Sequence, residues 1–196
     1  LVQTYMDFLR NYDIDGFKLD FIDCFQPGEL TRDFCPEMDF PTVGEAVRKL
    51  LEDITTALAQ VKTDLLYEYR QNYIGPAINK FGNMLRVCDC AYESQFNRVG
   101  IADLRLMNYP IAIHSDMLFW SSKESIRLCA RQLLNILFAV PQISVLLADS
   151  TEEQKKLLTY FIRYWTENRH ILLHGDFRPL HPEMDYSMIS AEGDEK

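Results

Sequence analysis

The most constraining feature of this sequence is a regular alternation of short β-strand patterns with longer amphipathic helical patterns. Period-two spacing of apolar residues, or a short apolar run, predicts strands at residues 15–22, 64–70, 83–90, 110–117 and 142–147. Apolar residues spaced three and four apart predict helices at residues 1–12, 43–61, 95–107, 123–139 and 152–168. Because strands joined by crossover helices form parallel sheets, the chain is expected to be an α/β protein.

Three of the predicted helices begin with a capping box, in which a hydroxyl accepts a hydrogen bond from the amide three residues further on. The pairs are Thr42 with Glu45, Ser121 with Glu124, and Ser150 with Glu153. Each pair marks the residue at which the corresponding helix is expected to start.

The residues that follow the strands distinguish between two kinds of parallel sheet. A doubly wound nucleotide-binding sheet would carry a glycine-rich turn after a strand, and this sequence has none. Asp, Glu, Arg and His follow the strands instead, as in a (β/α)8 TIM barrel, whose active site collects polar residues at the C-terminal rim. About five βα units are visible where a closed barrel needs eight. We therefore expect the C-terminal portion of a barrel at residues 1–182, a polar tail at residues 183–196, and further barrel units upstream.

Composition narrows the classes of partner. The 196 residues carry 29 acidic and 20 basic side chains, a net charge of -9 that argues against nucleic acid. No apolar stretch approaches the roughly 20 residues of a membrane span. The five cysteines form no CxxC pair, which favours reduced thiols in a cytoplasmic protein over a metal or disulfide framework. No cofactor and no metal are expected, and a homo-oligomer is possible because open strand edges favour association.

Period-two geometry places polar side chains of three strands on the faces that would line a barrel interior. The pairs that share a face are Lys18 with Asp20, Glu68 with Arg70, and His114 with Asp116. Any single pair can be a structural ion pair that satisfies a buried charge. Three strands together indicate a functional site.

The segment that contains Asp20 reads DGFKLDF at residues 15–21 and resembles the corresponding strand of the α-galactosidase-like glycoside hydrolases of family 36. The resemblance implies that Asp20 is the catalytic nucleophile of a retaining enzyme. Residues 83–89 are similar to the stretch that carries the acid/base of that family, which implies this role for Asp89. Residues 140–144 resemble the region of the eighth barrel strand.

The sequence departs from family 36 in two places. The glycine-rich segment usual in α-galactosidases is replaced by YEYRQNY at residues 67–73, and Arg86 stands where a tryptophan is usual. These positions line the sugar pocket in the family, so the retaining mechanism carries over better than galactose specificity. Family 31 α-glucosidases and α-xylosidases have a similar strand and remain an alternative.

The residues support this chemistry independently, because retaining glycosidases need one carboxylate nucleophile and one carboxyl acid/base. Lys18 is expected to keep Asp20 ionised, with Asp23 as the fallback nucleophile. Asp89 is the preferred acid/base and Asp116 the second choice. The expected substrate-binding residues are Lys18, Glu68, Arg70, Arg86, His114 and Asp116, and Trp120 is expected to stack on a sugar or to lie in the core.

The sequence thus predicts a retaining α-glycosidase that acts on an oligosaccharide or another α-glycoside. Two further classes stay open. A metal-dependent barrel hydrolase could use His114, Asp116, Glu68 and Asp20 as ligands, although such sites usually contain several histidines. A carbohydrate-binding fragment without activity is the other class, because part of the barrel is expected to lie outside this chain.

Overall fold

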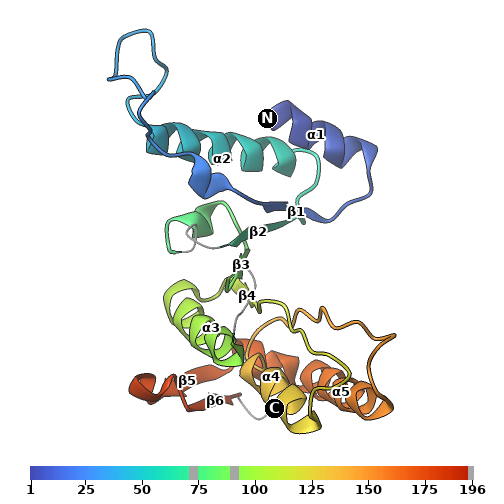
Figure 1. Ribbon diagram of the computed structural model, residues 1–196. Coiled ribbons are helices and arrows are strands. Elements are labelled where there is room, and N and C mark those ends of the chain that lie inside the picture. The colour runs from blue at the N-terminus through green and yellow to red at the C-terminus, as the bar shows by residue number, and fades with distance from the viewer. Residues whose placement is uncertain (71–74, 89–92, 194–196) are drawn as a thin grey trace. The chain divides into compact units, whose positions relative to one another are not determined.

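The computed structural model of the chain describes residues 1–70, 75–88 and 93–193 (Figure 1). The chain divides into two compact units, Leu1–Asn83 and Met84–Lys196. Each unit contains one pair of parallel strands and its own helices. The expected α/β class is therefore confirmed, whereas the boundary predicted at residue 182 stays a prediction.

The first unit contains two helices and two parallel strands. Its elements in chain order are α1 (Val2–Asn11), β1 (Gly16–Leu19), the 3-10 helix η1 (Ile22–Cys24), α2 (Val43–Ala59), β2 (Leu66–Arg70) and the 3-10 helix η3 (Ile78–Lys80). The register of the strands sets Lys18 beside Glu68 and Leu19 beside Tyr69. At the start of β1 a side chain at Gly16 would collide with the Leu66 carbonyl, so the close approach of the two strands requires glycine there.

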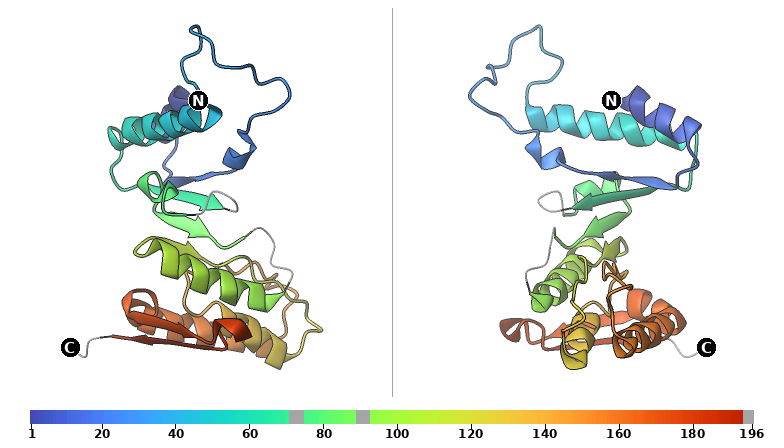
Figure 2. Two further views of the ribbon diagram at one scale, coloured as in Figure 1. Left: turned by 90° about the vertical axis from the view of Figure 1, so that its left-hand side faces the viewer. Right: turned by 45° about the vertical axis from the view of Figure 1, so that its right-hand side comes forward.

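The core of the first unit lies where α1 and α2 pack on the strands. The two helices lie side by side in both sets of views (Figures 1 and 2). Leu9, Ile54, Leu58 and Leu65 are buried together, and side chains of β1 and β2 pack against them. The predicted apolar stripe of the 43–61 helix supplies two of these four residues, which confirms its periodicity.

The second unit contains the other pair of parallel strands. Its elements are β3 (Met84–Arg86), α3 (Ser94–Asn108), β4 (Ala112–His114), α4 (Ile126–Asn135), α5 (Glu152–His174), β5 (Asp176–Leu180), the 3-10 helix η4 (Pro182–Met184) and β6 (Met188–Glu192). β3 and β4 are parallel, with Arg86 beside His114. α3 contacts α4, and α4 contacts α5 (Figure 1).

Arg105 joins α3 to the end of α5. Its guanidinium donates to the carbonyls of Leu172, at 2.6 Å, and Leu173, at 2.9 Å, and lies 3.9 Å from the ring centroid of Phe177. Burial lowers the pKa of Arg105 to about 10. The cation thereby satisfies carbonyls that the end of a helix leaves without partners.

The predicted helix starts differ in accuracy. The Thr42 hydroxyl accepts from the Glu45 amide at 3.2 Å, as expected. The next helix begins later than predicted, because Ser125 rather than Ser121 caps α4 by accepting from the Leu128 amide. The last helix is capped by Thr151 in a capping box with Gln154, not by Ser150 with Glu153. Helix boundaries differ from sequence-based expectations by a few residues when several hydroxyls lie close to the start of a helix.

Two predictions about strands are corrected. Residues 142–147 were expected to form a strand, but they contain one isolated bridge, Leu118 to Ile143, and a second bridge, His114 to Val140, lies just before them. The segment predicted as a polar tail, residues 183–196, includes the strand β6, which pairs antiparallel with β5. This hairpin was not predicted, because β5 contains a proline, which argues against a strand, and both strands stay partly exposed.

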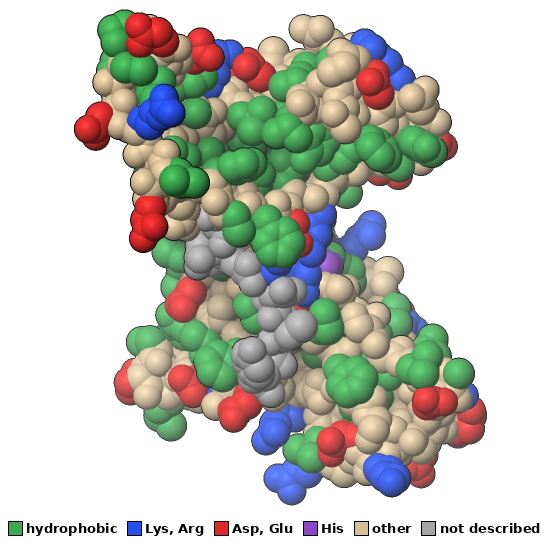
Figure 3. Space-filling model, turned by 45° about the horizontal axis from the view of Figure 1, so that its top comes forward, with side chains coloured by type: hydrophobic (Ala, Val, Ile, Leu, Met, Phe, Trp, Pro, Cys, Tyr) green, Lys and Arg blue, Asp and Glu red, His purple; other side chains and the backbone are tan. Residues whose placement is uncertain are grey.

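Large apolar side chains are common on the surface, as the green atoms of Figure 3 show. The exposed ones include Leu30 at 96% and Phe119 at 70% of their full area. Apolar surface of this kind favours association, and the expected homo-oligomer stays a prediction. Within the described residues, no helix has both the length and the apolarity that crossing a bilayer would require.

Candidate active site

Three predicted site residues meet at the C-terminal ends of β1 and β2. Lys18 lies within β1, Asp20 follows the last residue of β1, and Arg70 is the last residue of β2. Because the strands are parallel and Leu19 lies beside Tyr69, the next positions along both strands are neighbours. We call Lys18, Asp20 and Arg70 the Asp20 cluster.

The carboxylate of Asp20 is held by two cations that act on different oxygens. Nε of Arg70 donates to Oδ1 at 2.6 Å, and the Arg70 side chain is only 6% exposed. Nζ of Lys18 lies 3.6 Å from Oδ2, which is an ion-pair distance rather than a hydrogen bond. The Asp20 side chain keeps 33% of its area exposed, so solvent and ligands reach it.

These contacts keep Asp20 ionised. The hydrogen bond from Arg70 is the main cause that holds the pKa of Asp20 below its usual value, while partial burial opposes it and Lys18 contributes less. The sequence indicated Lys18 as the stabilising cation and Arg70 as a substrate ligand. The contact between Lys18 and Asp20 is present, but the main cation is Arg70.

Phe21 follows Asp20 in an unusual conformation. Its backbone is left-handed, with φ 55° and ψ 20°, and its amide donates to Oδ1 of Asp20 at 2.8 Å. A residue other than glycine in this region costs about 1–2 kcal/mol. The Phe21 ring is 65% exposed and lies 5.5 Å from the Arg70 guanidinium carbon. Backbone strain of this kind is found more often at functional sites than elsewhere.

The turn at Phe21 corrects the predicted facing of this strand. Alternation along the strand predicted at residues 15–22 would place Phe21 on the same face as Phe17 and Leu19, opposite Ile22. The left-handed turn at Phe21 ends the alternation after Asp20, so Ile22 is buried while Phe21 faces outward. Asp23, the fallback nucleophile, belongs to η1, and its side chain lies outside the described part of the chain.

Glu68 is half-buried in β2 beside Lys18. It lies two residues before Arg70 on the same strand, so it shares the face of the Asp20 cluster. A carboxylate in this position can accept hydrogen bonds from sugar hydroxyls. Its predicted role as a substrate ligand stays a prediction.

The second unit has its own charged cluster, formed by Arg86, Cys88, Asn97 and Asp116 and called here the Asp116 cluster. Oδ1 of Asp116 accepts from Nη2 of Arg86 at 2.7 Å, from Nε of Arg86 at 3.2 Å and from the amide of Met117 at 2.8 Å. Oδ2 accepts from the Cys88 thiol at 3.0 Å. The amide of Asp116 donates to the Asn97 side chain at 2.8 Å.

The Asp116 cluster has the properties of a structural ion pair. The side chain of Asp116 has no exposed area, and that of Arg86 keeps 5%. Burial raises the pKa of Asp116, but the hydrogen bonds from Cys88 and Arg86 outweigh it, so the net pKa lies below the usual value. A buried carboxylate that stays ionised has no proton to give. This geometry does not favour Asp116 as the acid/base or as a sugar ligand.

The remaining predicted site residues are placed as follows. His114 is half-buried at the end of β4 beside Arg86, and Trp120 is buried, so it lies in the core rather than on a sugar. Asp89, the preferred acid/base, lies outside the described residues. In the part of the chain that the structure describes, no three His, Cys, Asp or Glu side chains are arranged to hold a metal ion.

Cys88 and Asn97 were not among the predicted site residues. Asn97 belongs to α3, and its polar character on a buried helix face was the one available indication. Cys88 falls within the predicted 83–90 strand, but nothing local to it indicates a carboxylate partner 28 residues away.

Compared with solved structures, the fold of the chain is similar to part of each of two α-galactosidase structures. One match is the GH36 α-galactosidase AgaA of Geobacillus stearothermophilus, solved as a variant in complex with raffinose. The identity is 14% and the TM-score 0.69, over 92% of this chain and 26% of that one. Another is the galactosidase domain of the α-galactosidase-sucrose kinase AgaSK, at 13% identity and a TM-score of 0.63, over 93% of this chain and 25% of that one.

The chain thus spans about a quarter of the length of the solved structures it resembles. No family model matches the sequence, and a comparison with curated proteins gives no match. At these identities the likeness concerns the fold alone.

Proposed function

We propose that this chain carries the nucleophile of a retaining α-glycosidase that resembles α-galactosidases and hydrolyses terminal α-linked sugars. The observation that carries the proposal is the state of Asp20, an accessible carboxylate at the end of a parallel strand, kept ionised by Arg70 and Lys18. A glycosidase nucleophile must be ionised, rigidly held and open to substrate. The likeness to GH36 α-galactosidases supports the same assignment.

The contacts of Asp20 favour one oxygen for attack. Oδ1 accepts hydrogen bonds from Arg70 and from the Phe21 amide, which fix the orientation of the carboxylate. Oδ2 has the Lys18 ammonium at the longer distance of 3.6 Å. We assign Oδ2 as the oxygen that bonds to the anomeric carbon, because it loses less hydrogen bonding when it attacks.

The first step forms a bond between Oδ2 and the anomeric carbon and breaks the bond between that carbon and the leaving oxygen. A carboxyl acid delivers a proton to the leaving oxygen as it departs. Asp89 is proposed for this role on the resemblance of residues 83–89 to the acid/base stretch of family 36. The pairing of Asp116 with Arg86 and Cys88 supports the choice of Asp89 over Asp116.

In the second step Asp89 acts as a base instead of an acid. The Asp89 carboxylate accepts a proton from water as the water oxygen bonds to the anomeric carbon, and the bond to Asp20 breaks. Two displacements at one carbon return the α-configuration. Glu68, on the face of the Asp20 cluster, is proposed to select the sugar by accepting hydrogen bonds from its hydroxyls.

Covalent trapping tests the assignment. An α-configured cyclophellitol aziridine alkylates the nucleophile of retaining α-glycosidases, so incubation should add one inhibitor mass to the peptide that contains Asp20. The Asp20→Ala variant should not be labelled. The matched control is Asp15→Asn, which alters an exposed carboxylate just before the same strand and should be labelled normally. Labelling of another carboxylate, or near-normal turnover by Asp20→Ala, would refute the proposal.

A further inference from the structure

A groove between α4 and α5 in the second unit has a volume of about 330 Å³ and is lined by apolar and aromatic side chains. Leucines and an alanine of α4 form one wall, and a leucine, a phenylalanine and two tyrosines of α5 form the other. Leu134 is 65% exposed, Tyr160 59% and Tyr164 42%, although the apolar face of a helix is usually buried against a neighbour. The groove therefore leaves apolar surface in water that a partner would cover.

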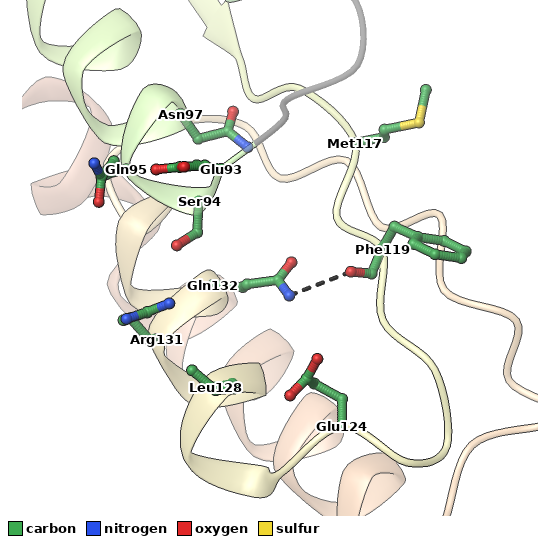
Figure 4. Close-up of a pocket in the computed structure, with 10 residues that line it drawn as sticks. All are labelled: Glu93, Ser94, Gln95, Asn97, Met117, Phe119, Glu124, Leu128, Arg131 and Gln132. Atoms are coloured by element: carbon green, nitrogen blue, oxygen red, sulfur yellow. Dashed lines mark hydrogen bonds between the residues drawn. The ribbon is translucent and has the colours of Figure 1, made fainter.

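The groove is formed before any partner arrives, because hydrogen bonds fix both of its helices. Nε1 of Trp165 on α5 donates to the Ala139 carbonyl at 3.0 Å, in the segment that follows α4. Nε2 of Gln154, at the start of α5, donates at 3.0 Å to two carbonyls of the loop that precedes α4. On another face of α4 the Gln132 side chain donates to the Phe119 carbonyl at 3.2 Å (Figure 4). A groove that is already rigid loses little conformational entropy when it is occupied.

Basic side chains outnumber acidic ones around this groove. Residues three, four or seven positions from an exposed lining residue share its helix face. The exposed basic side chains at these positions are Arg127, Arg131, Lys156 and Arg163. The exposed acidic ones are Glu153 and Glu167. The charge balance around the groove is thus positive, whereas the chain as a whole has a net charge of -9.

A segment of the first unit has the complementary properties. Residues 25–42 join η1 to α2 without a helix or strand, and they project beyond the start of α2 (Figures 1 and 2). Leu30 is 96% exposed and Phe34 56%. The segment carries one basic residue, Arg32, and the acidic residues Glu29, Asp33, Glu37 and Asp39. Loops longer than about 12–15 residues without secondary structure are uncommon and are often binding loops.

We propose that residues 29–40 of one copy of this chain bind in the α4–α5 groove of another copy. Leu30 and Phe34 would cover the apolar lining, and the carboxylates that flank them would lie beside the basic side chains of the groove. Opposite charges favour this contact over one between two grooves, in which basic side chains would face each other. Both surfaces belong to this chain, so no second kind of protein is needed. This association is independent of the proposed glycosidase activity.

Sedimentation equilibrium measures the self-association of the chain and of two double variants. The loop variant carries Leu30→Ser and Phe34→Ser, and the groove variant carries Leu134→Ser and Tyr160→Ser. Each should weaken self-association at least about tenfold, because two apolar contacts are lost. The substituted side chains are exposed, so both variants should fold, and circular dichroism checks this.

Mixing the two variants identifies the surfaces that meet. The loop variant keeps an intact groove and the groove variant keeps an intact loop, so a one-to-one mixture should form dimers although neither variant does so alone. A contact between two grooves or between two loops would not be restored in this mixture. The matched control is Phe8→Ser with Leu106→Ser, which alters side chains that are 51% and 58% exposed on α1 and α3. It should associate as the unaltered protein does.

Charge reversal in the loop tests the complementarity of charge. Glu29→Lys with Asp33→Lys makes the chain less negative, which by itself would favour association between copies. Self-association should nevertheless weaken, because the new lysines would meet the basic side chains of the groove. Unchanged or stronger association of this variant would overturn the proposal. The same conclusion would follow from an unaltered protein that stays monomeric, from a loop or groove variant that associates as the control does, or from a mixture that stays monomeric.

Discussion

Nε of Arg70 lies 2.6 Å from Oδ1 of Asp20, and this contact joins the ends of two parallel strands that are 50 residues apart in sequence. The guanidinium is almost fully buried while the carboxylate remains accessible. Such a pair is asymmetric, because the guanidinium is withdrawn from solvent whereas part of the carboxylate stays open to it. Arg70 therefore holds Asp20 in position and keeps its carboxyl group ionised.

Replacing Arg70 by methionine should raise the pKa of Asp20, because the hydrogen bond that lowers it most is lost. The reactive form is the carboxylate, so the acidic limb of the pH profile of kcat/KM should move to higher pH. At its optimum kcat/KM should fall at least about tenfold. The control Arg48→Met removes a solvent-exposed arginine of α2 and should leave the profile unchanged. If the acidic limb of the pH profile did not move in Arg70→Met, Arg70 would not be the residue that keeps Asp20 ionised.

Replacing Glu68 by glutamine should change substrate choice. If Glu68 accepts a hydrogen bond from one sugar hydroxyl, its loss should cost about 1–3 kcal/mol of transition-state binding for the sugar that carries this hydroxyl. The measurement compares kcat/KM for aryl α-galactosides, α-glucosides and α-xylosides. Glu52→Gln on α2, where the side chain is 52% exposed, is the matched control. Equal losses on all three substrates would make Glu68 a structural residue.

Replacing Asp116 by asparagine should destabilise the fold. The substitution removes the charge that lies 2.7 Å from the buried Arg86 guanidinium, and removal of one member of a buried ion pair typically costs about 3–5 kcal/mol. Chemical denaturation measures the change in free energy of unfolding. Glu152→Gln, which breaks the exposed pair with Lys155, should cost less than about 1 kcal/mol. A similar small cost for Asp116→Asn would show that the buried pair contributes little.

The same pair should make stability depend on pH. The pKa of Asp116 is lower in the folded protein than its usual value, so the unfolded chain binds a proton more readily. Its contribution to stability is therefore fully present above the unfolded pKa and is lost as pH falls through the folded pKa. The acid-induced loss of stability between these two values should be smaller in Asp116→Asn than in the unaltered protein, as measured by denaturation at several pH values.

Azide should rescue Asp89→Ala on aryl glycosides with good leaving groups, since these need no proton and azide needs no general base. The product should be a glycosyl azide of α-configuration, because it forms by displacement of Asp20. Nuclear magnetic resonance of the product identifies the anomer. The contrasting control is Asp20→Ala, in which azide would attack directly and give the β-anomer. Absence of rescue in Asp89→Ala would transfer the acid/base role to another residue.

Local sequence patterns identified most elements of the fold. The helices at α1, α2, α3 and α5 were predicted within a few residues of their starts, because period-three-and-four spacing reflects one buried face. The strands β1 to β4 were also predicted, but each is shorter in the structure than the sequence indicated. Ends of strands depend on where the partner strand stops pairing, and this is not encoded next to the strand itself.

The sequence by itself determined that Lys18 and Asp20 share a face, and that Glu68 and Arg70 share another, because side chains alternate along any strand. Only the tertiary structure decided that Arg70 holds Asp20 and that Arg86 neutralises Asp116, since these contacts depend on the register between strands far apart in the chain. The turn at Phe21 likewise depends on the Asp20 carboxylate accepting its amide. Period-two patterning assigns a residue to a face, whereas the packing of the whole unit selects the partner it meets there.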